Sequence, residues 1–439
     1  MHNRIAALLL GAGALAYSAP ASAQHHDTSG THRMPHADAA AHGTEQGMDH
    51  EMWSAELGQG WRILGMAQVF PVVTIGAPGQ DDDHALRATE WYFTQPALML
   101  NLEDRRQRVA LRTTLNPEGA FIEDGELTFG GWGEGFIDKR HPHTLLHELM
   151  LSVNFGDPAT TAFSVSAGKG FAPYGTDDPM ARPALKYPTN HHLSQILERW
   201  TVNAMVLTDG WSLEAGIFGG AEPEGPYDLS NIESFGDSWS ARVAKRWGAG
   251  VGPLAEWEAS ASWGSVLEEH HGESGRTTLW NAALRHLRST SRGQVYGLLE
   301  ASRSEPEHGD GYFSVLGEAR IEAGAHQPYA RLEYATRPEY AREGAPGTDG
   351  FFRYHHGDDA IGATRWLIGT LAYARELTGY PFSVRPFAEG QYHRVRAERG
   401  GLDPEALFGS DTFWSVSLGA RVYIGGDPMR MGAYGVLDP

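Results

Sequence analysis

The side chains best suited to bind a metal ion gather near the start of the chain. Residues 24–52 hold six His and three Met. Imidazole and thioether together suit copper, and imidazole also suits zinc. We expect copper or zinc to bind here through His25, His26, His32, His36, Met48, His50 and Met52, with Met34 and His42 nearby. The alternative is a solubilising linker with incidental His, because this polar stretch has no apolar periodicity and is expected to be disordered.

A second set of imidazoles lies in two later polar segments. His141, His143 and His147 share one parity of an extended chain, and His191 and His192 follow in the next polar segment. Imidazoles together with carboxylates could form a zinc- or copper-type site. The alternative is ordinary solvated loop chemistry. In neither place do we expect an obligatory cofactor.

Charged side chains at every second position of several segments are the other chemical feature. Placed around an enclosed passage, they would filter small solutes by charge. The alternative is cross-strand pairing of Arg with Glu, which stiffens a wall. Arg prevails in the earlier segments and Glu in the later ones, so we expect one basic wall. The residues expected to line the passage are Arg108, Arg112, Arg199, Arg242, Arg246, Glu256, Glu258, Glu318, Arg320, Arg331, Arg385 and Glu389.

The composition excludes several classes of function. The chain contains no Cys, which excludes a disulfide framework, thiolate zinc sites and thiol catalysis. A formal net charge of −20 argues against a nucleic-acid partner. Neither a Gly-x-Ser-x-Gly elbow nor a His-Glu-x-x-His motif occurs, so we do not expect an enzyme.

The first 23 residues predict a secretory signal peptide. Arg4 precedes an uncharged apolar run, and Ala21-Ser22-Ala23 has the form of a cleavage site. The run is too short to cross a bilayer as a helix. The predicted organisation is a signal peptide at 1–23, a disordered His/Met-rich tail at 24–54, a folded body at 55–426 and a C-terminal tail at 427–439.

The folded body is expected to consist of strands. Apolar and polar residues alternate with a period of two, most clearly at 412–424, where Trp414, Val416 and Leu418 share one face. Sixteen segments qualify: 61–75, 93–103, 106–116, 144–155, 161–169, 195–207, 211–220, 238–247, 254–265, 277–287, 294–303, 312–323, 327–336, 361–375, 382–394 and 412–424.

The connections between these segments alternate between short turns and mostly long loops. That layout predicts an all-β, transmembrane antiparallel barrel of about 16 strands, apolar outside and polar inside. A secreted soluble all-β protein is the alternative. Tryptophans near the predicted strand ends are expected to form interfacial girdles. They are Trp61, Trp91, Trp200, Trp211, Trp239, Trp247, Trp257, Trp263, Trp280, Trp366 and Trp414.

In this architecture residues 55–426 resemble the bacterial outer-membrane porins, although no motif is shared. One departure is that thirteen residues follow Gly426, whereas many such proteins end on the last strand. The resemblance implies a channel for small hydrophilic solutes or ions in the outer membrane, with both termini periplasmic. Its partners would be the lipid bilayer, lipopolysaccharide and two further copies in a homotrimer.

The same resemblance implies a constriction. Porins commonly fold their third loop into the lumen, and residues 170–194 form the third long loop here. Asp177, Asp178 and Arg182 would then line the pore, the alternative being an outer cap. The His/Met tail resembles that of outer-membrane copper-resistance proteins. A non-conducting, metal-sequestering barrel and a surface adhesin or structural barrel are therefore the competing functions.

Overall fold

A computed structural model of the chain describes residues 53–80, 85–117, 144–182, 191–223, 227–250, 255–270, 273–291, 293–307, 311–340, 360–379, 382–405, 410–425 and 431–437. Two units divide the chain, residues 1–45 and 46–439, and all described residues belong to the second. The predicted signal peptide and the metal-ligand candidates of the tail, with His141 and His143, lie outside the described residues.

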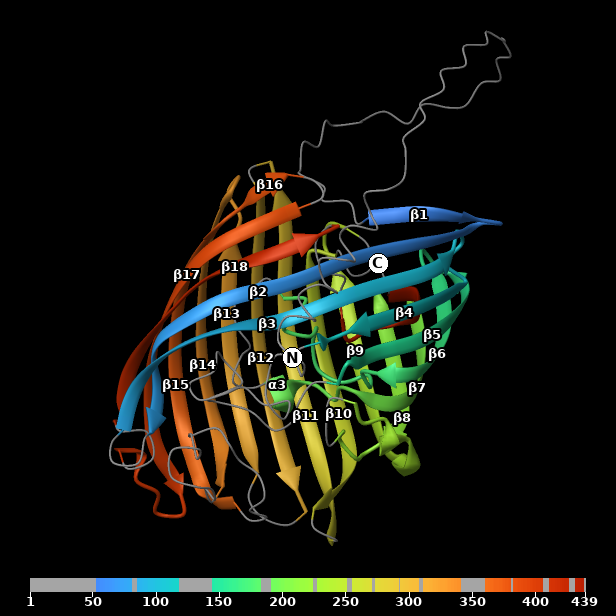
Figure 1. The fold of residues 1–439 in the computed structure, drawn as a ribbon. Coiled ribbons are helices and arrows are strands. Elements are labelled where there is room, and N and C mark those ends of the chain that lie inside the picture. Colours follow the sequence, from blue (N-terminus) through green and yellow to red (C-terminus); the bar gives the residue numbers. More distant parts are fainter. Residues whose placement is uncertain are drawn as a thin grey trace, which may run out of the picture. The chain divides into compact units, whose positions relative to one another are not determined.

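One antiparallel sheet closes on itself to form a barrel (Figure 1). Each strand pairs with its neighbours in sequence, and the last strand pairs with β2. Within the described residues the closed ring has sixteen strands: β2 (Trp61–Gln80), β3 (Ala85–Asp104), β4 (Val109–Leu115), β5 (Leu146–Asp157), β6 (Thr161–Gly170), β7 (Arg199–Thr208), β8 (Trp211–Gly219), β9 (Phe235–Trp247), β10 (Trp257–His270), β11 (Glu273–Thr290), β12 (Gly293–Pro306), β13 (Tyr312–Ile321), β14 (His326–Tyr340), β15 (Ala360–Arg375), β17 (Phe382–Arg399) and β18 (Thr412–Ile424).

Short elements accompany the ring. Strand β1 (Trp53–Gly58) pairs with β2, and β16 (Leu377–Gly379) pairs with β17. The helical turns are α3 (His191–Ser194), η3 (Ser230–Ser234) and η5 (Gly435–Leu437). Nowhere in the described ranges is a helix long and apolar enough to cross a membrane.

The sixteen predicted strands are all confirmed, and several are longer than predicted. The β2–β3 hairpin continues until Gln80 pairs with Ala85, and β17 continues to Arg399. These extensions are rich in polar and small residues. Backbone pairing with a neighbour holds them in the sheet even where apolar alternation has stopped.

The two faces of the strands differ as a barrel with an apolar outside requires. In β18, Trp414 is 67 % exposed on the outside, whereas the adjacent Ser415 is 2 % exposed on the inside. Leu371 is likewise 72 % exposed on the outer face of β15. A soluble sandwich would bury the apolar face instead, so the soluble alternative is wrong. An apolar exterior with a polar interior is the arrangement that lipid demands.

Among the described side chains, outward tryptophans gather on neighbouring strands, with one exception to the prediction. The side chain of Trp91 lies outside the described residues. Trp263 stacks on Trp280 with ring centres 5.1 Å apart, and Trp239 meets Trp263 edge-on at 5.0 Å. Trp366, predicted to lie in a girdle, instead points into the barrel and is fully buried. Its ring packs edge-on against His393 and Phe413. Interior contacts with an imidazole and an aromatic ring outweigh the interfacial preference of Trp at this position.

Candidate functional site

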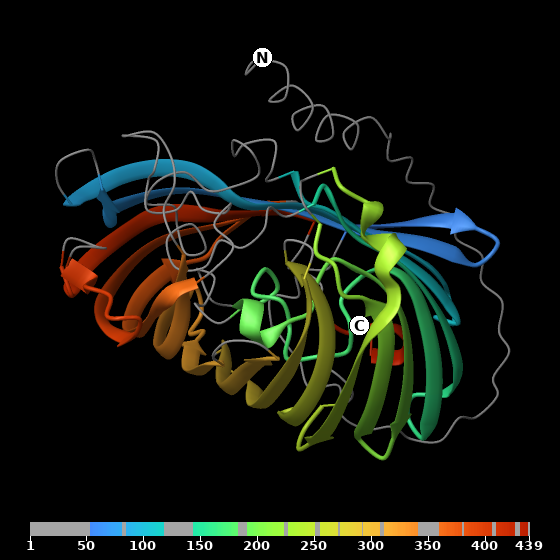
Figure 2. The ribbon, with the colours of Figure 1, turned by 90° about the horizontal axis from the view of Figure 1, so that it is seen from below.

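Two segments from distant parts of the chain fold into the lumen. Residues 171–182 and α3 leave the end of β6 and lie inside the ring of strands (Figure 2). Residues 431–437, which include η5, follow β18 and contact β5 and β6. We call these the loop segment (171–182) and the C-terminal segment (431–437). The interior of the barrel is therefore occupied by folded chain as well as lined by wall side chains.

An ion pair fixes the loop segment to the wall. Nη2 of Arg182 lies 3.3 Å from Oε2 of Glu300 on β12, and both side chains are almost completely buried. The hydroxyl of Thr176 donates to the same carboxylate and accepts from Arg182. Burial alone would lower the Arg182 pKa, but the Glu300 and Glu318 carboxylates raise it above its ordinary value. Arg182 therefore stays charged and anchored.

A tight turn at Gly175 brings the loop segment against two further wall strands. Its N–H donates to Ser262 Oγ of β10 at 2.8 Å, and its carbonyl accepts from Arg242 of β9 at 3.2 Å. The backbone φ is +67°, and a Cβ here would lie 1.6 Å from the Ser194 carbonyl oxygen. Only glycine fits this conformation and this contact.

The acidic residues of the loop segment have different roles. Asp178 is buried, and its carboxylate accepts from the Met180 N–H at 2.7 Å, which closes a local turn. Its own N–H donates to the Met431 carbonyl at 3.1 Å, so it also joins the two lumen segments. Asp177 is half-buried and borders a pocket together with Arg182. Of the predicted constriction residues, Asp177 is thus the least buried.

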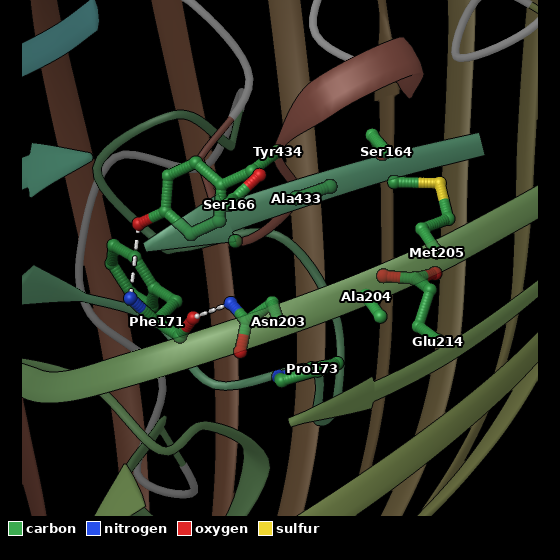
Figure 3. Close-up of a pocket in the computed structure, with 11 residues that line it drawn as sticks. Ser164, Ser166, Phe171, Pro173, Asn203, Ala204, Met205, Glu214, Ala433 and Tyr434 are labelled. Atoms are coloured by element: carbon green, nitrogen blue, oxygen red, sulfur yellow. Dashed lines mark hydrogen bonds between the residues drawn. The ribbon is translucent and has the colours of Figure 1, made fainter. Parts of the chain in front are cut away.

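The C-terminal segment is anchored by Tyr434 (Figure 3). Its hydroxyl donates to Glu148 of β5 at 2.8 Å and accepts from the Phe171 N–H at 2.9 Å. The Phe171 carbonyl in turn accepts from Asn203 of β7 at 2.9 Å. Burial, followed by the nearby Glu148 carboxylate, raises the pKa of Tyr434 well above its ordinary value. The phenol therefore remains a donor at neutral pH.

One arginine ties both lumen segments to the wall. Arg242 on β9 binds Glu214 of β8 through two contacts, of 3.0 and 2.6 Å. The same guanidinium donates to the Gly175 carbonyl and, at 3.1 Å, to the Gly432 carbonyl. A fork-shaped cation with five donors is suited to this task. Arg242 was predicted as a pore-lining residue, and here its charge is directed at protein groups.

Apolar side chains complete the attachment. Wall residues Met66, Phe70, Met99 and Met150 pack with residues of both lumen segments in one buried cluster. The lumen-segment members are Phe171, Met180, Met431 and Tyr434. Burying several such side chains stabilises the inserted arrangement by about 1.5–3 kcal/mol each. Both segments are therefore integral parts of the folded interior.

Charged side chains of the wall form pairs across adjacent strands. Glu258 on β10 faces Arg246 on β9 and Arg285 on β11 in register, at 2.5 and 3.7 Å. Glu318 on β13 faces Arg331 on β14 at 2.9 Å. Arg385 on β17 contacts Glu376. Both signs of charge therefore lie side by side around the lumen.

A charged pocket remains beside the loop segment. It is small and is lined by Asp177 and Arg182 on one side and by Glu258 and Arg285 on the other. A second small pocket lies where the C-terminal segment meets β6 to β8 (Figure 3). The first pocket is lined by charged side chains of both signs.

The other predicted pore residues fall in several environments. Arg108 is exposed in the turn before β4, and Glu256 lies before β10 near His286 and Arg288. Arg199 pairs with Glu222 at 2.7 Å, and Arg320 bonds to Gln294 at 2.9 Å. The remaining members, Arg112 and Glu389, are buried on the inner face of the wall.

Several functional residues were not identified from sequence. Glu148, Glu300 and Glu376 bind the residues that hold the interior together, and Tyr434 anchors the C-terminal segment. The inward parity of Glu300 within 294–303 was a usable signal. No local pattern marked Tyr434, which lies in a segment predicted as a tail.

The loop histidines do not form a metal cluster in the part of the chain that is described. Nδ1 of His147 lies 2.6 Å from Oε1 of Glu198, both side chains are buried, and Glu198 also accepts from the Thr144 N–H. Across the described residues, no group of three or more His, Asp or Glu side chains could hold a metal ion. The backbone of His191 and His192 starts α3, while their side chains lie outside what is described. A metal site here stays a prediction.

Comparison with known proteins finds similarity at the level of structure. The sequence matches no protein-family model and no curated protein. A loop-deletion mutant of OmpT, an outer membrane protein of Vibrio cholerae, aligns with 11 % identity and a TM-score of 0.48, covering 83 % of this chain and all of that one. An anion-selective porin from Comamonas acidovorans aligns with 10 % identity and a TM-score of 0.46, covering 85 % of this chain and 100 % of that one. OprB of Pseudomonas putida aligns with 13 % identity and a TM-score of 0.45, covering 83 % of this chain and 94 % of that one. The likeness concerns the barrel fold alone.

Proposed function

We propose that this chain is a porin-like channel of the bacterial outer membrane for small hydrophilic solutes or ions. The proposal rests on one observation above all. The loop segment is fixed inside a barrel with an apolar exterior and leaves a pocket of mixed charge between Asp177, Arg182, Glu258 and Arg285. A solute that crosses there exchanges water for charged and polar side chains, which favours hydrophilic over apolar cargo.

The two lumen segments set the expected size limit. Because both are anchored by buried hydrogen bonds and apolar contacts, the passage beside them is narrow. We expect a small conductance and weak preference between anions and cations, since the wall pairs opposite charges. The long loops would face outward and both termini the periplasm. Assembly as a homotrimer belongs to the same proposal.

Planar-bilayer recording tests the channel. The full-length protein, purified and folded, is added to a phosphatidylcholine bilayer in KCl, with heat-denatured protein as the control. Discrete current steps are expected from the folded protein only. A folded protein that gives no steps, even after Arg182→Gln has loosened the loop segment, would instead support the non-conducting or adhesin alternatives.

A metal-binding role for the tail is the second candidate. It is supported by the density of His and Met in residues 24–52. The expected result is that the full chain binds Cu(II) or Zn(II) and that deletion of residues 24–52 lowers the stoichiometry in equilibrium dialysis. Equal uptake with and without the tail would contradict this role. A variant with His147→Ala tests the loop histidines separately.

A further inference from the structure

The C-terminal segment (431–437) lies in the lumen as an inserted peptide and not as a part of the wall. The sixteen strands close their ring without it, since β18 already pairs with β2 before the segment begins. Its residues Met431, Ala433 and Tyr434 are almost completely buried, and its one regular element is the helical turn η5. The wall and the loop segment therefore enclose it as a receptor encloses a bound peptide.

Two main-chain carbonyls of the segment accept hydrogen bonds from the groups around it. The Met431 carbonyl accepts from the Asp178 N–H of the loop segment at 3.1 Å, and the Gly432 carbonyl accepts from Arg242 of β9, also at 3.1 Å. Every residue of a peptide carries such a carbonyl. These two donors would therefore hold the main chain of a peptide from another molecule in the same way.

A site for a tyrosine hydroxyl is built into the end of β6. The Tyr434 hydroxyl donates to Glu148 at 2.8 Å and accepts from the Phe171 N–H at 2.9 Å (Figure 3). A Cβ at Gly170 would lie 2.2 Å from the same hydroxyl oxygen, so glycine at this position leaves the space that the phenol fills. Because an acceptor, a donor and a space all match one hydroxyl group, the site favours tyrosine over phenylalanine.

The inner wall changes from polar to apolar beside the segment. Along β7 the buried, inward-facing Asn203 is followed by the inward-facing Met205 and Leu207. These two side chains form a cluster with Ala433, and Val436 packs against the same cluster. A water-filled lumen calls for a polar wall, whereas apolar side chains at these positions match an apolar occupant.

Two glycines of the segment complete the match. Gly432 and Gly435 have φ angles of +102° and +75°, which side chains with a Cβ rarely adopt. A Cβ on Gly435 would also lie 2.2 Å from the Ser164 Oγ of β6. The surroundings thus fit a peptide of the form Gly-x-Tyr-Gly, in which x is a small apolar residue.

We propose that the lumen holds a binding site for peptides of the form Gly-x-Tyr-Gly and that the C-terminal segment is its resident ligand. We call this site the lumen cradle, and its residues are Glu148, Gly170, Asp178, Met205, Leu207 and Arg242. A peptide of another molecule binds when the segment has left, so the two compete for one site. The lumen cradle goes beyond the proposed channel, because peptide binding does not depend on the passage of solutes.

This competition sets the affinity that an added peptide would show. A ligand joined to its site by a short connection acts at an effective concentration of about millimolar, so a peptide in solution binds the wild type weakly. Tyr434→Ala removes the ring and the hydroxyl bonds of the resident ligand and leaves every residue of the lumen cradle unchanged. The apparent affinity for an added peptide rises with the fraction of cradles that the segment has left.

Fluorescence anisotropy of the full-length protein in detergent tests the proposal. The probe is a labelled synthetic peptide with the sequence of residues 431–437, and the comparison peptide has phenylalanine in place of its tyrosine. The tyrosine peptide is expected to bind the Tyr434→Ala protein about tenfold to a hundredfold more tightly than the wild type. The phenylalanine peptide should bind this variant more weakly. Tyr373→Ala, which removes an exposed tyrosine of β15, is the matched control and should behave like the wild type.

Gly170→Ala tests the hydroxyl site directly. Combined with Tyr434→Ala, it fills the space of the phenol oxygen, so the tyrosine peptide should bind about tenfold more weakly. The phenylalanine peptide, which has no hydroxyl, should change less. Should Tyr434→Ala fold poorly, Tyr434→Phe keeps the ring and tests the same order, with tighter binding of the tyrosine peptide than in the wild type.

Two results would overturn the proposal. One is equal binding of the tyrosine peptide to the wild type and to the folded Tyr434 variants, and the other is equal binding of the two peptides to Tyr434→Ala. Both are measured in detergent without any conductance. Failure of peptide binding and absence of channel activity are therefore separate outcomes.

Discussion

Arg182 and Glu300 form a buried ion pair that joins the loop segment to strand β12, with 3.3 Å between the guanidinium Nη2 and the carboxylate Oε2. The two residues are 118 positions apart in sequence. Since neither charge reaches solvent, each depends on the other for compensation. This electrostatic contact is therefore one of the anchors that hold the loop segment inside the lumen.

Breaking this pair is expected to open the lumen. Arg182→Gln leaves the Glu300 carboxylate buried without its guanidinium, a loss of about 3–5 kcal/mol for such pairs. The loop segment should leave the wall more often, which raises mean single-channel conductance and current noise. In the double variant Arg182→Gln/Glu300→Gln no uncompensated charge is left, so the conductance should return part of the way to the wild-type value. A double variant as open as Arg182→Gln alone would show that the charges do not hold the segment.

The C-terminal segment should be released at high pH. Burial raises the pKa of Tyr434, so its folded-state value lies above the ordinary value of about 10. The stabilisation that comes from the neutral phenol is complete below about pH 10 and is lost as the pH rises through the folded pKa. We expect conductance to increase over this alkaline range.

Tyr434→Phe provides the control for that pH dependence. It removes the hydroxyl contacts with Glu148 and the Phe171 N–H at a cost of about 1–3 kcal/mol. The conductance of the Tyr434→Phe variant should be higher than that of the wild type at neutral pH. It should also increase less than the wild-type conductance when the pH is raised. Burial also raises the pKa of Tyr174. A small pH dependence of conductance should therefore remain in the Tyr434→Phe variant, because Tyr174 still loses its proton at high pH. Identical pH profiles for the two proteins would refute the role of Tyr434.

Gly175→Ala should disturb the turn of the loop segment. The φ of +67° disfavours Ala by about 1–2 kcal/mol, and the added Cβ would overlap the Ser194 carbonyl, which cannot move as freely as a side chain. Limited proteolysis is expected to cut within 171–198 faster than in the wild type. Gly369→Ala, where a Cβ meets nothing within 4 Å, is the matched control and should behave like the wild type.

Glu258→Gln should shift ion selectivity toward anions. This carboxylate lies 2.5 Å from Arg246 and 3.7 Å from Arg285, so its loss removes a negative charge from the pocket lining and leaves the Arg285 guanidinium there. A unit charge about 10 Å from the ion path in water contributes about 0.4 kcal/mol, or about a twofold change in permeability ratio. The permeability ratio is measured from reversal potentials in a KCl gradient. Glu305→Gln, on the outer face, should leave selectivity unchanged.

The barrel itself could be predicted because its determinants are local. Alternating burial, such as Trp414 outside and Ser415 inside, is imposed on each strand separately by lipid and lumen. Strand ends were less predictable, since Arg396 and Arg399 remain in β17 through backbone pairing where apolar alternation has ended. The prediction that Trp366 lies in the interfacial girdle was wrong, because its interior contacts come from β17 and β18, which are distant in sequence from any local pattern around it.

The contents of the lumen could be predicted only in part. The position of residues 170–194 within the chain suggested a constriction, and Arg182 was among its expected residues. The partner Glu300 and the anchor Tyr434 depend on contacts across the closed ring, which no local pattern encodes. Arg242 illustrates the same limit, because its inward parity was evident but its bonds to Gly175 and Gly432 were not.

The hydrogen bond between Tyr434 and the Phe171 N–H also bears on the order of assembly. It joins residues 263 positions apart, and contacts of such long sequence separation form late because their loop-closure entropy is compensated only by structure already in place. Tyr434 also needs Glu148 on β5 and the completed β18 before it can dock. The barrel should therefore close while its lumen is still wide, and narrowing should be the last step of folding.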